Sequence, residues 1–312
     1  PDTARSGPST FMKASAQSRQ MALRPALYSR ILDDRSLTAA AEVAADIGYD
    51  GLEVMGREPH LPAETTVETA RTLRDHFDEL GLAVPCIYTS TGGYVGRPDE
   101  ERETELDALE PFLELAAVLD CPIVKHGVGG PPEHRADDAD YEVAAEWLGR
   151  AADRAAEHGR QVGLEIHAGT LTESAEGTAK LIDMTDRENV VAIHDAGNMY
   201  IAESDFGARS VEVLGDRLAH LHVKDLAPVE DETLPGAFTT GTPSGERTFQ
   251  HRHLGEGAVD HAELFAALAE MGFDGYATDE CAVPQEGPDG DEQVARKEYD
   301  ALSESLARAR GN

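Results

Sequence analysis

One pattern recurs along this chain and constrains its fold more than any other feature: a short apolar run that ends in polar residues and leads into a helical segment. Residues 190–194 are apolar or β-branched up to a final histidine, and Asp195 and Asn198 follow. Such runs are typical of buried parallel strands that enter loops holding polar side chains. Three further runs end in the same way, at residues 162–166, 218–223 and 276–279.

From residue 24 onward, strand-like runs alternate with segments of helical periodicity, without a break in composition. The expected strands are residues 24–28, 51–54, 82–88, 122–126, 162–166, 190–194, 218–223 and 276–279. The expected helices are residues 37–47 (capped by Ser36), 64–80, 99–119, 138–158, 173–184 (capped by Thr172), 204–214, 259–271 and 292–310. Eight β-then-α units of this length predict a parallel sheet closed into a (β/α)₈ TIM barrel.

A doubly wound open sheet is the alternative architecture, and it would place a glycine-rich phosphate turn after the first strand. Residues 28–30, Tyr-Ser-Arg, form no such turn. We therefore predict one barrel domain over residues 21–312, with a long polar loop at residues 227–253 after the seventh strand. Residues 1–20 are expected to be a disordered tail, with Met12 or Met21 as the candidate true start.

The charge excludes some classes of function. The chain has 27 basic and 60 acidic residues, a net charge of −33. Binding to phosphate backbones needs basic groups, so a nucleic-acid partner is not expected. An acidic surface of this density indicates a heavily hydrated, salt-adapted protein, and we expect a halophilic, haloarchaeal source.

The cysteines and the apolar runs indicate in which cellular compartment the protein is expected. Cys86, Cys121 and Cys281 are widely spaced, which predicts neither a disulfide framework nor a thiolate zinc site and favours a reducing cytoplasm. No run reaches the length of a membrane helix, and residues 1–20 lack the apolar core of a signal peptide, so no membrane partner is expected. The sequence leaves the oligomeric state open, a homo-oligomer included.

The strand ends predict a metal site. In a barrel the C-terminal ends of the strands carry the active site, and side chains two residues apart on a strand share a face. Three carboxylates and one imidazole would therefore converge from four consecutive strands: Glu165, Asp195, His222 and Glu280. This oxygen-rich set suits Mn²⁺ or Mg²⁺, with Co²⁺ or Zn²⁺ as alternatives. His220 is expected to pack or to support the site rather than to bind the metal.

Six short motifs accompany the expected strands: residues 48–53 (GYDGLE), 164–169 (LEIHAG), 194–198 (HDAGN), 220–225 (HLHVKD), 254–257 (LGEG) and 275–280 (GYATDE). In this order and spacing they resemble the sugar phosphate isomerase/epimerase superfamily, the xylose isomerase-like TIM barrels, over residues 24–310. The resemblance implies the same four metal ligands. It also implies that the two glutamates among them, Glu165 and Glu280, act as the acid/base pair.

The function that this resemblance implies is a divalent-metal-dependent isomerase or epimerase of a sugar or sugar phosphate. The metal would stabilise an enediolate while one glutamate removes a proton and the other returns it. The expected substrate contacts are His167 and Asn198 as hydrogen-bond partners, Lys224 and Lys125 opposite a phosphate, carboxylate or oxyanion, Glu53 at substrate hydroxyls, and Tyr28 and Tyr88 along the pocket.

Two departures from the ketose epimerases keep a second function open. Those enzymes typically carry a histidine three residues after the metal-binding aspartate, where this chain has Asn198. They follow the metal-binding histidine with an arginine-bearing segment, where this chain has Lys224 and Asp225, as in the inosose dehydratase-like branch. The alternative is therefore a metal-dependent dehydratase of an inosose or a sugar-derived keto compound. A non-catalytic sugar-binding barrel is disfavoured because all four ligands are present.

Overall fold

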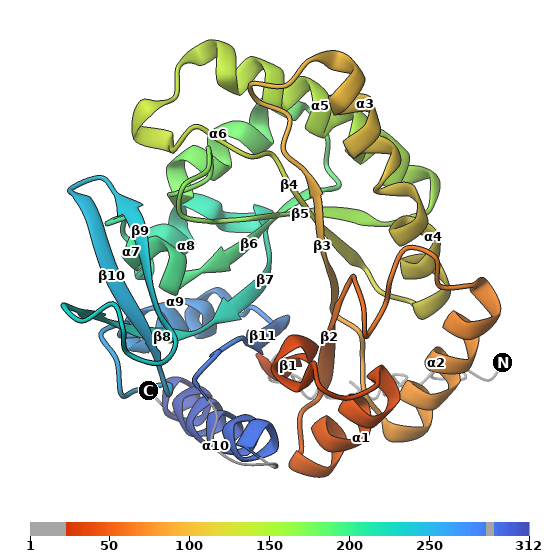
Figure 1. Ribbon diagram of the computed structural model, residues 1–312, viewed down its shortest axis with the longest axis vertical. Helices are drawn as coiled ribbons and strands as arrows, with labels where there is room; N and C mark the ends of the chain where they lie inside the picture. Colours follow the sequence, from red (N-terminus) through yellow and green to blue (C-terminus); the bar gives the residue numbers. More distant parts are fainter. Residues whose placement is uncertain (1–22, 285–289, 312) are drawn as a thin grey trace, which may run out of the picture.

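Eight parallel strands close into a barrel in the computed structural model, which describes residues 23–284 and 290–311 (Figure 1). Around the barrel the strand order is β1-β11-β7-β6-β5-β4-β3-β2, so the predicted TIM-barrel class is confirmed. The strands are β1 Arg24–Tyr28, β2 Gly51–Met55, β3 Cys86–Gly92, β4 Ile123–Gly127, β5 Gln161–Glu165, β6 Val190–Asp195, β7 Leu218–Val223 and β11 Tyr276–Asp279. The predicted tail at residues 1–20 and both candidate starts lie outside the described residues.

Helices surround the barrel, as Figure 1 shows. They are α1 Leu37–Ile47, α2 Val67–Leu80, α3 Asp99–Asp107, α4 Glu110–Leu119, α5 Asp138–Glu157, α6 Ala175–Thr185, α7 Ala196–Ile201, α8 Ala208–Leu214, α9 Ala262–Met271 and α10 Gly290–Arg310. The predicted cap of α1 is confirmed, because the Ser36 hydroxyl accepts from the Ala39 amide at 3.3 Å. None of the helices in the described part of the chain combines the length and the apolar character that a membrane span requires.

Two expected helices differ in the structure, and one helix was not expected. The single helix predicted over residues 99–119 is two helices, α3 and α4, and Pro111 lies in the first turn of α4, where its missing N–H costs nothing. Helix α6 is capped by Ser174 rather than Thr172, since the Ser174 hydroxyl accepts from the Gly177 amide at 3.0 Å. Helix α7, a short helix directly after β6, was not predicted; the Asp195 side chain caps it.

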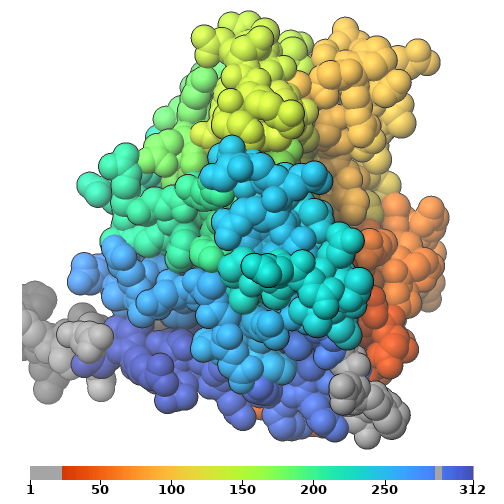
Figure 2. Space-filling model, turned by 60° about the vertical axis from the view of Figure 1, so that its left-hand side comes forward, coloured from red at the N-terminus to blue at the C-terminus, as the bar shows by residue number. Residues whose placement is uncertain are grey.

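The largest correction concerns residues 227–253, which are not a long polar loop. They form most of a three-stranded antiparallel sheet, ordered β8-β10-β9, from β8 Asp225–Val229, β9 Ala237–Thr242 and β10 Gly245–Arg252. Phe249 of β10 is fully buried and its ring contacts the rings of Tyr200 and Phe238. Figure 2 shows this sheet in cyan and light blue at the front of the molecule, beside the green segments. We call it the lid sheet.

The barrel interior is apolar only over a short depth. Outward-facing residues of the strands belong to one large core shared with the helices, whereas a small cluster of Cys86, Ile123, Val191 and Ile193 fills the inside. Gly163 completes that floor, because a Cβ there would lie 2.6 Å from the Ile123 side chain and 2.7 Å from that of Ile193. The inward positions nearer the strand ends carry charged side chains, so the floor separates the polar mouth from the opposite end of the barrel.

Several histidines in this fold are neutral and have no access to water. His126, on β4, is fully buried between the hydroxyls of Thr91 and Tyr94. Burial and the nearby Lys125 charge lower the pKa of His126 to about 3. The unfolded chain binds a proton at an ordinary pKa of about 6.5, so acidification from that pH toward 3 favours unfolding.

We therefore expect His126→Gln to unfold less steeply with falling pH than the parent protein. Below pH 6 the unfolded parent binds one more proton than the folded parent, at His126. Its free energy of unfolding therefore falls by about 1.4 kcal/mol more per pH unit than that of the variant. Urea unfolding at pH values from 8 to 4.5 measures the difference in slope. Parallel slopes for the two proteins would mean that His126 is already protonated in the fold.

Candidate functional site

The structure brings the four predicted metal ligands together at the barrel mouth. Glu165, Asp195, His222 and Glu280 each offer one atom, and these atoms all lie within 4.8 Å of one another. They come from the ends of β5, β6 and β7 and from the residue after β11. At most 11% of any of these side chains is exposed. The donor set is therefore compact, largely dry and rich in carboxylate oxygens.

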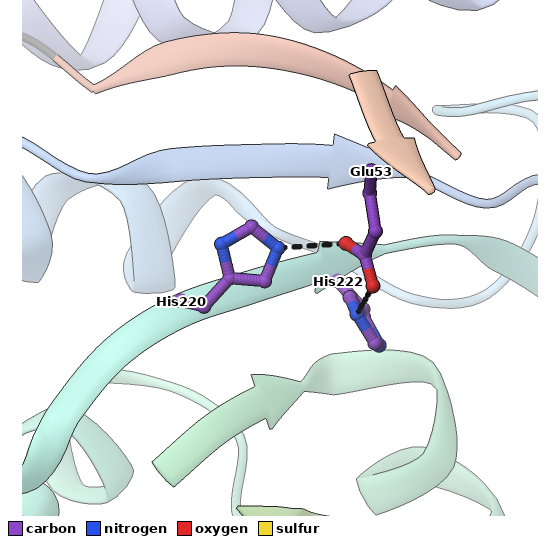
Figure 3. A group of neighbouring side chains, drawn as sticks. All are labelled: Glu53, His220 and His222. Carbon is purple, nitrogen blue, oxygen red and sulfur yellow. Dashed lines mark hydrogen bonds and ion pairs between the residues drawn. The ribbon is translucent and has the colours of Figure 1, made fainter. Parts of the chain in front are cut away.

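His222 is held between this cluster and a buried carboxylate. Its Nδ1 lies 3.0 Å from a Glu165 oxygen, and its Nε2 lies 3.0 Å from an oxygen of Glu53. Figure 3 shows Glu53 between two imidazoles, with its second oxygen 2.8 Å from Nε2 of His220. Burial alone would lower the pKa of His222, but Glu53 and Glu280 raise it well above its usual value. Nδ1 thus attracts a positive partner, either a proton or a metal ion.

Glu53 has no exposed surface in this structure, and its expected contact with substrate hydroxyls stays a prediction. Its two oxygens accept from His220 and His222, which is the arrangement that fixes the ring orientation of metal-binding histidines. His220 also contacts the Thr278 hydroxyl at 2.9 Å. The expected supporting role of His220 agrees with these contacts.

Lys224 lies inside the ligand cluster. Its Nζ donates to Asp195 Oδ2 and to Glu280 Oε1, both at 2.6 Å. Burial alone would lower the pKa of Lys224, but the two carboxylates raise it, so the amine is charged. Gly197 leaves room for this side chain, since a Cβ there would lie 2.5 Å from Lys224 Cγ. The glycine of the HDAGN motif is therefore required by the path of Lys224.

Asn198 orients Asp195. The Asn198 backbone amide donates to Asp195 Oδ1 at 2.9 Å and its side-chain amide donates to Oδ2 at 2.5 Å. The same side-chain nitrogen donates to the carbonyl of Ile166 at 3.2 Å. Burial raises the pKa of Asp195 to about 7, while Lys224 opposes that rise. Asn198 also borders the hollow above the cluster, with the amide nitrogen directed at protein oxygens.

Glu165 is surrounded by donors. The Tyr88 hydroxyl donates to its Oε2 at 3.0 Å, and Lys125 Nζ lies 3.5 Å from the same oxygen. Lys125 also lies 4.4 Å from the centre of the Tyr88 ring, which in turn packs 5.1 Å from the ring of Tyr28. Burial alone would raise the pKa of Glu165, but Lys125 and His222 lower it well below its usual value. Glu165 is therefore ionised.

His167 follows β5 at the rim and is exposed. Its Nδ1 lies 2.8 Å from the carbonyl of Ala168, which can only accept, so Nδ1 carries a proton. In the neutral ring Nε2 is then an acceptor. His167 borders both hollows beside Glu165, so a hydroxyl of a bound molecule can donate to it.

Two hollows flank Glu165, with volumes of about 310 and 360 Å³. Lys125 and Tyr88 line the smaller one. The larger one extends from the cluster to the lid sheet, whose Phe238 and His251 form part of its wall. Arg30, which follows β1, lies at the same hollow. The sequence did not single out Arg30, Phe238 or His251, because only the folded barrel brings β1 and the lid sheet to the mouth.

Asp225, the last residue of the HLHVKD motif, binds the backbone of the LGEG motif. Its Oδ1 accepts from the amides of Leu226 and Val259, and its Oδ2 accepts from those of Gly255 and Gly257. Asp225 thus ties the LGEG loop to the end of β7. Charge-assisted bonds to four amides make this a rigid anchor beside Lys224.

Comparison with known proteins identifies a family and several relatives. A family model described as Xylose isomerase-like TIM barrel matches residues 41–305. Inosose dehydratase of Lacticaseibacillus casei is 28% identical over 242 residues, 73% of this chain and 76% of that protein. L-ribulose 3-epimerase of Methylomonas sp. (strain DH-1) is 31% identical over 246 residues, 75% of this chain and 74% of that protein.

Solved structures share the fold. The IOLI protein, crystallised with a zinc atom, has a TM-score of 0.74 at 16% identity and covers 92% of this chain and 99% of its own. The probable 3-DHS dehydratase AsbF of Bacillus anthracis has a TM-score of 0.72 at 18% identity, covering 90% of this chain and 99% of its own.

The contacts of Glu53 lead to a prediction about metal affinity. Glu53→Gln is expected to weaken Mn²⁺ or Co²⁺ binding about 10- to 100-fold, because the neutral amide supports the His222 ring less strongly than the carboxylate. Isothermal titration calorimetry measures the affinity, and Glu68→Gln on the exposed face of α2 is the matched control. Equal metal affinities for the parent and Glu53→Gln would contradict this role.

Proposed function

Because the chain belongs to the xylose isomerase-like TIM barrel family, we propose that it is a divalent-metal-dependent isomerase or epimerase of a sugar or sugar phosphate. The observation that carries the proposal is the convergence of Glu165, Asp195, His222 and Glu280 within 4.8 Å at the barrel mouth. Two of the four are glutamates from different strands, as proton transfer on two sides of a substrate carbon requires.

Glu165, Asp195, His222 and Glu280 would hold the metal. The cluster fits a cation because it already binds the charged amine of Lys224 between Asp195 and Glu280. When bound, a divalent ion would stabilise the negative charge that develops on substrate oxygens. The three carboxylates favour Mn²⁺ or Mg²⁺, with Co²⁺ or Zn²⁺ as alternatives.

Glu165 is the proposed base. Lys125 and His222 lower its pKa, so its oxygens are free of protons, and the Tyr88 hydroxyl orients Oε2. Glu280 is the proposed partner on the other side. Burial alone would raise the pKa of Glu280, but Lys224 and His222 lower it. The Lys224 ammonium donates a hydrogen bond to Glu280 Oε1 and holds the ionised carboxylate in place, ready to take up and return a substrate proton.

A second candidate is a hydro-lyase that acts on an inosose or a related keto compound. Removal of the same proton leads to loss of water when a hydroxyl group on the neighbouring carbon leaves. The position of Asn198 favours this candidate, since its amide is committed to Asp195 and the Ile166 carbonyl. The dehydratase name of several relatives points the same way.

The source, the cellular compartment and the oligomeric state of the protein are also matters of proposal. We propose a halophilic, haloarchaeal source because the net charge of −33 is spread along the chain. Cys86, Cys121 and Cys281 are buried and unpaired, which supports a reducing cytoplasm. A homo-oligomer stays an open proposal.

Solvent exchange tests the reaction. The Mn²⁺-loaded protein is incubated in D₂O with ketoses, aldoses and inososes and followed by NMR. We expect deuterium to enter the substrate, with loss of water only if the enzyme is a lyase. Exchange on none of these compounds would contradict both candidate functions.

Glu280→Gln tests the acid/base assignment. Loss of a general acid/base typically costs 10²- to 10⁴-fold in rate, so exchange should fall by at least about 100-fold while the fold remains intact by circular dichroism. Glu304→Gln, on exposed α10, is the matched control. Undiminished turnover of Glu280→Gln would remove Glu280 from this role.

Salt should stabilise the protein. Raising KCl from about 0.1 to 2 M shortens the screening length from about 10 Å to below 3 Å and so weakens the repulsion among surface carboxylates. A gain of a few kcal/mol would raise Tm by about 5–10 °C. Calorimetry measures Tm, and sucrose at equal osmolality is the non-ionic control. A Tm that is independent of KCl would contradict the halophilic source.

A further inference from the structure

Basic residues are concentrated at the barrel mouth, although acidic residues dominate the chain. Acidic residues outnumber basic ones by 60 to 27 along the chain. Apart from Glu165 and Glu280, the charged residues that line the two hollows beside Glu165 are all basic: Arg30, Arg97, Lys125 and Lys224. A basic residue here that has no carboxylate partner would favour a ligand that carries negative charge.

Most of this positive charge is already balanced. The carboxylates of the site are the buried Glu53, Glu165 and Asp195 and the partly buried Glu280. Lys125, Lys224 and one divalent ion would together match their charge. Arg97 pairs with Glu105 at 2.6 Å. The remaining cation at the mouth is Arg30.

Arg30 is available to a ligand. In the described ranges, residues 23–284 and 290–311, no carboxylate lies within 4 Å of its guanidinium. The side chain is exposed, so binding an anion does not require an existing ion pair to break. Its backbone belongs to a 3₁₀ turn, Ser29–Leu32, in which the buried Ser29 hydroxyl accepts from the Met55 amide at 2.8 Å. Arg30 is therefore carried by a fixed turn.

The lid sheet completes the subsite. His251 and Phe238 lie across the larger hollow from β1, with ring centroids 5.3 Å apart. Nδ1 of His251 is buried and makes no hydrogen bond within the described part of the chain. Glu280 borders the same hollow as Arg30. A molecule in this hollow of about 360 Å³ can therefore reach both the proposed acid/base pair and Arg30.

We propose that the substrate carries a carboxylate or phosphate group, and that Arg30 binds this group with help from His251. This inference rests on the proposed proton transfer at Glu165 and Glu280 and adds the class of substrate. Guanidinium groups bind both kinds of anion through paired N–H donors. The substrate is then a hydroxyketone with an acidic end directed toward β1 and the lid sheet.

Matched substrate pairs test the proposal. One pair is a ketose and its phosphate ester, and the other is a cyclic polyhydroxyketone and its carboxylate analogue. With the Mg²⁺-loaded protein in D₂O we expect kcat/KM for exchange to favour the acidic member of at least one pair about 10-fold or more. The favoured pair distinguishes phosphate from carboxylate.

Arg30→Gln should reduce that preference about 10- to 100-fold, mainly through KM, and Arg30→Lys should restore part of it. Arg57→Gln is the matched control, since Arg57 is also exposed after a barrel strand but borders neither hollow. Equal use of both members of each pair, or an equal loss for both members in Arg30→Gln, would overturn the proposal.

A binding measurement separates this inference from the reaction. Titration of the Mg²⁺-loaded protein with inorganic phosphate and with malonate should give binding that Arg30→Gln weakens and Arg57→Gln does not. If this difference is found without exchange on any substrate, the anion subsite stands and the proposed reaction is wrong. If exchange occurs but anion binding is the same in all three proteins, the subsite is wrong and the reaction stands.

Discussion

The carboxylates at the barrel mouth repel one another, and the surrounding side chains offset this repulsion. Glu53, Glu165, Asp195 and Glu280 lie together in a space that excludes most water, where repulsion is strong. Lys125 and Lys224 reach into this space, two imidazoles bind Glu53, and Asn198 donates twice to Asp195. The apolar floor of the barrel keeps this cluster at the strand ends. Each of these contacts stabilises the ionised form of the candidate ligands. Together they balance only part of the negative charge, so the cluster can still bind a further cation.

The fold was predictable because the strand signal is repeated and local. Apolar runs that end in polar residues mark the barrel strands, and glycines such as Gly48 and Gly81 mark helix ends in the left-handed conformation. The lid sheet escaped prediction because β9 and β10 are rich in threonine, glycine and charge, and Phe249 is their one fully buried apolar side chain. The Pro-Ser-Gly sequence at residues 243–245, where β9 turns into β10, was the available signal of a hairpin turn.

The four candidate ligands were predictable for a simple reason: strand periodicity directs them inward, and the barrel brings strand ends together. The contacts of Glu53 and Lys224 were not, because they depend on which side chains meet across the barrel. Glu53 reaches β7 from β2, and Lys224 folds back over Gly197 toward Asp195. Arg30 was missed for the same reason, as its meaning depends on the lid sheet opposite it.

The lid sheet and the cluster of candidate metal ligands are separate parts of the molecule, so each can change in evolution without the other. Asp225 fixes the base of the lid sheet through four backbone amides, and none of the metal-ligand candidates belongs to the sheet. Only a few of its side chains, Phe238, Thr239, Thr240 and His251 among them, face the hollow. Substitutions at these positions alter the shape and polarity of the hollow and leave the four candidate metal ligands in place. A lineage of such enzymes can therefore acquire new substrates by altering one hairpin.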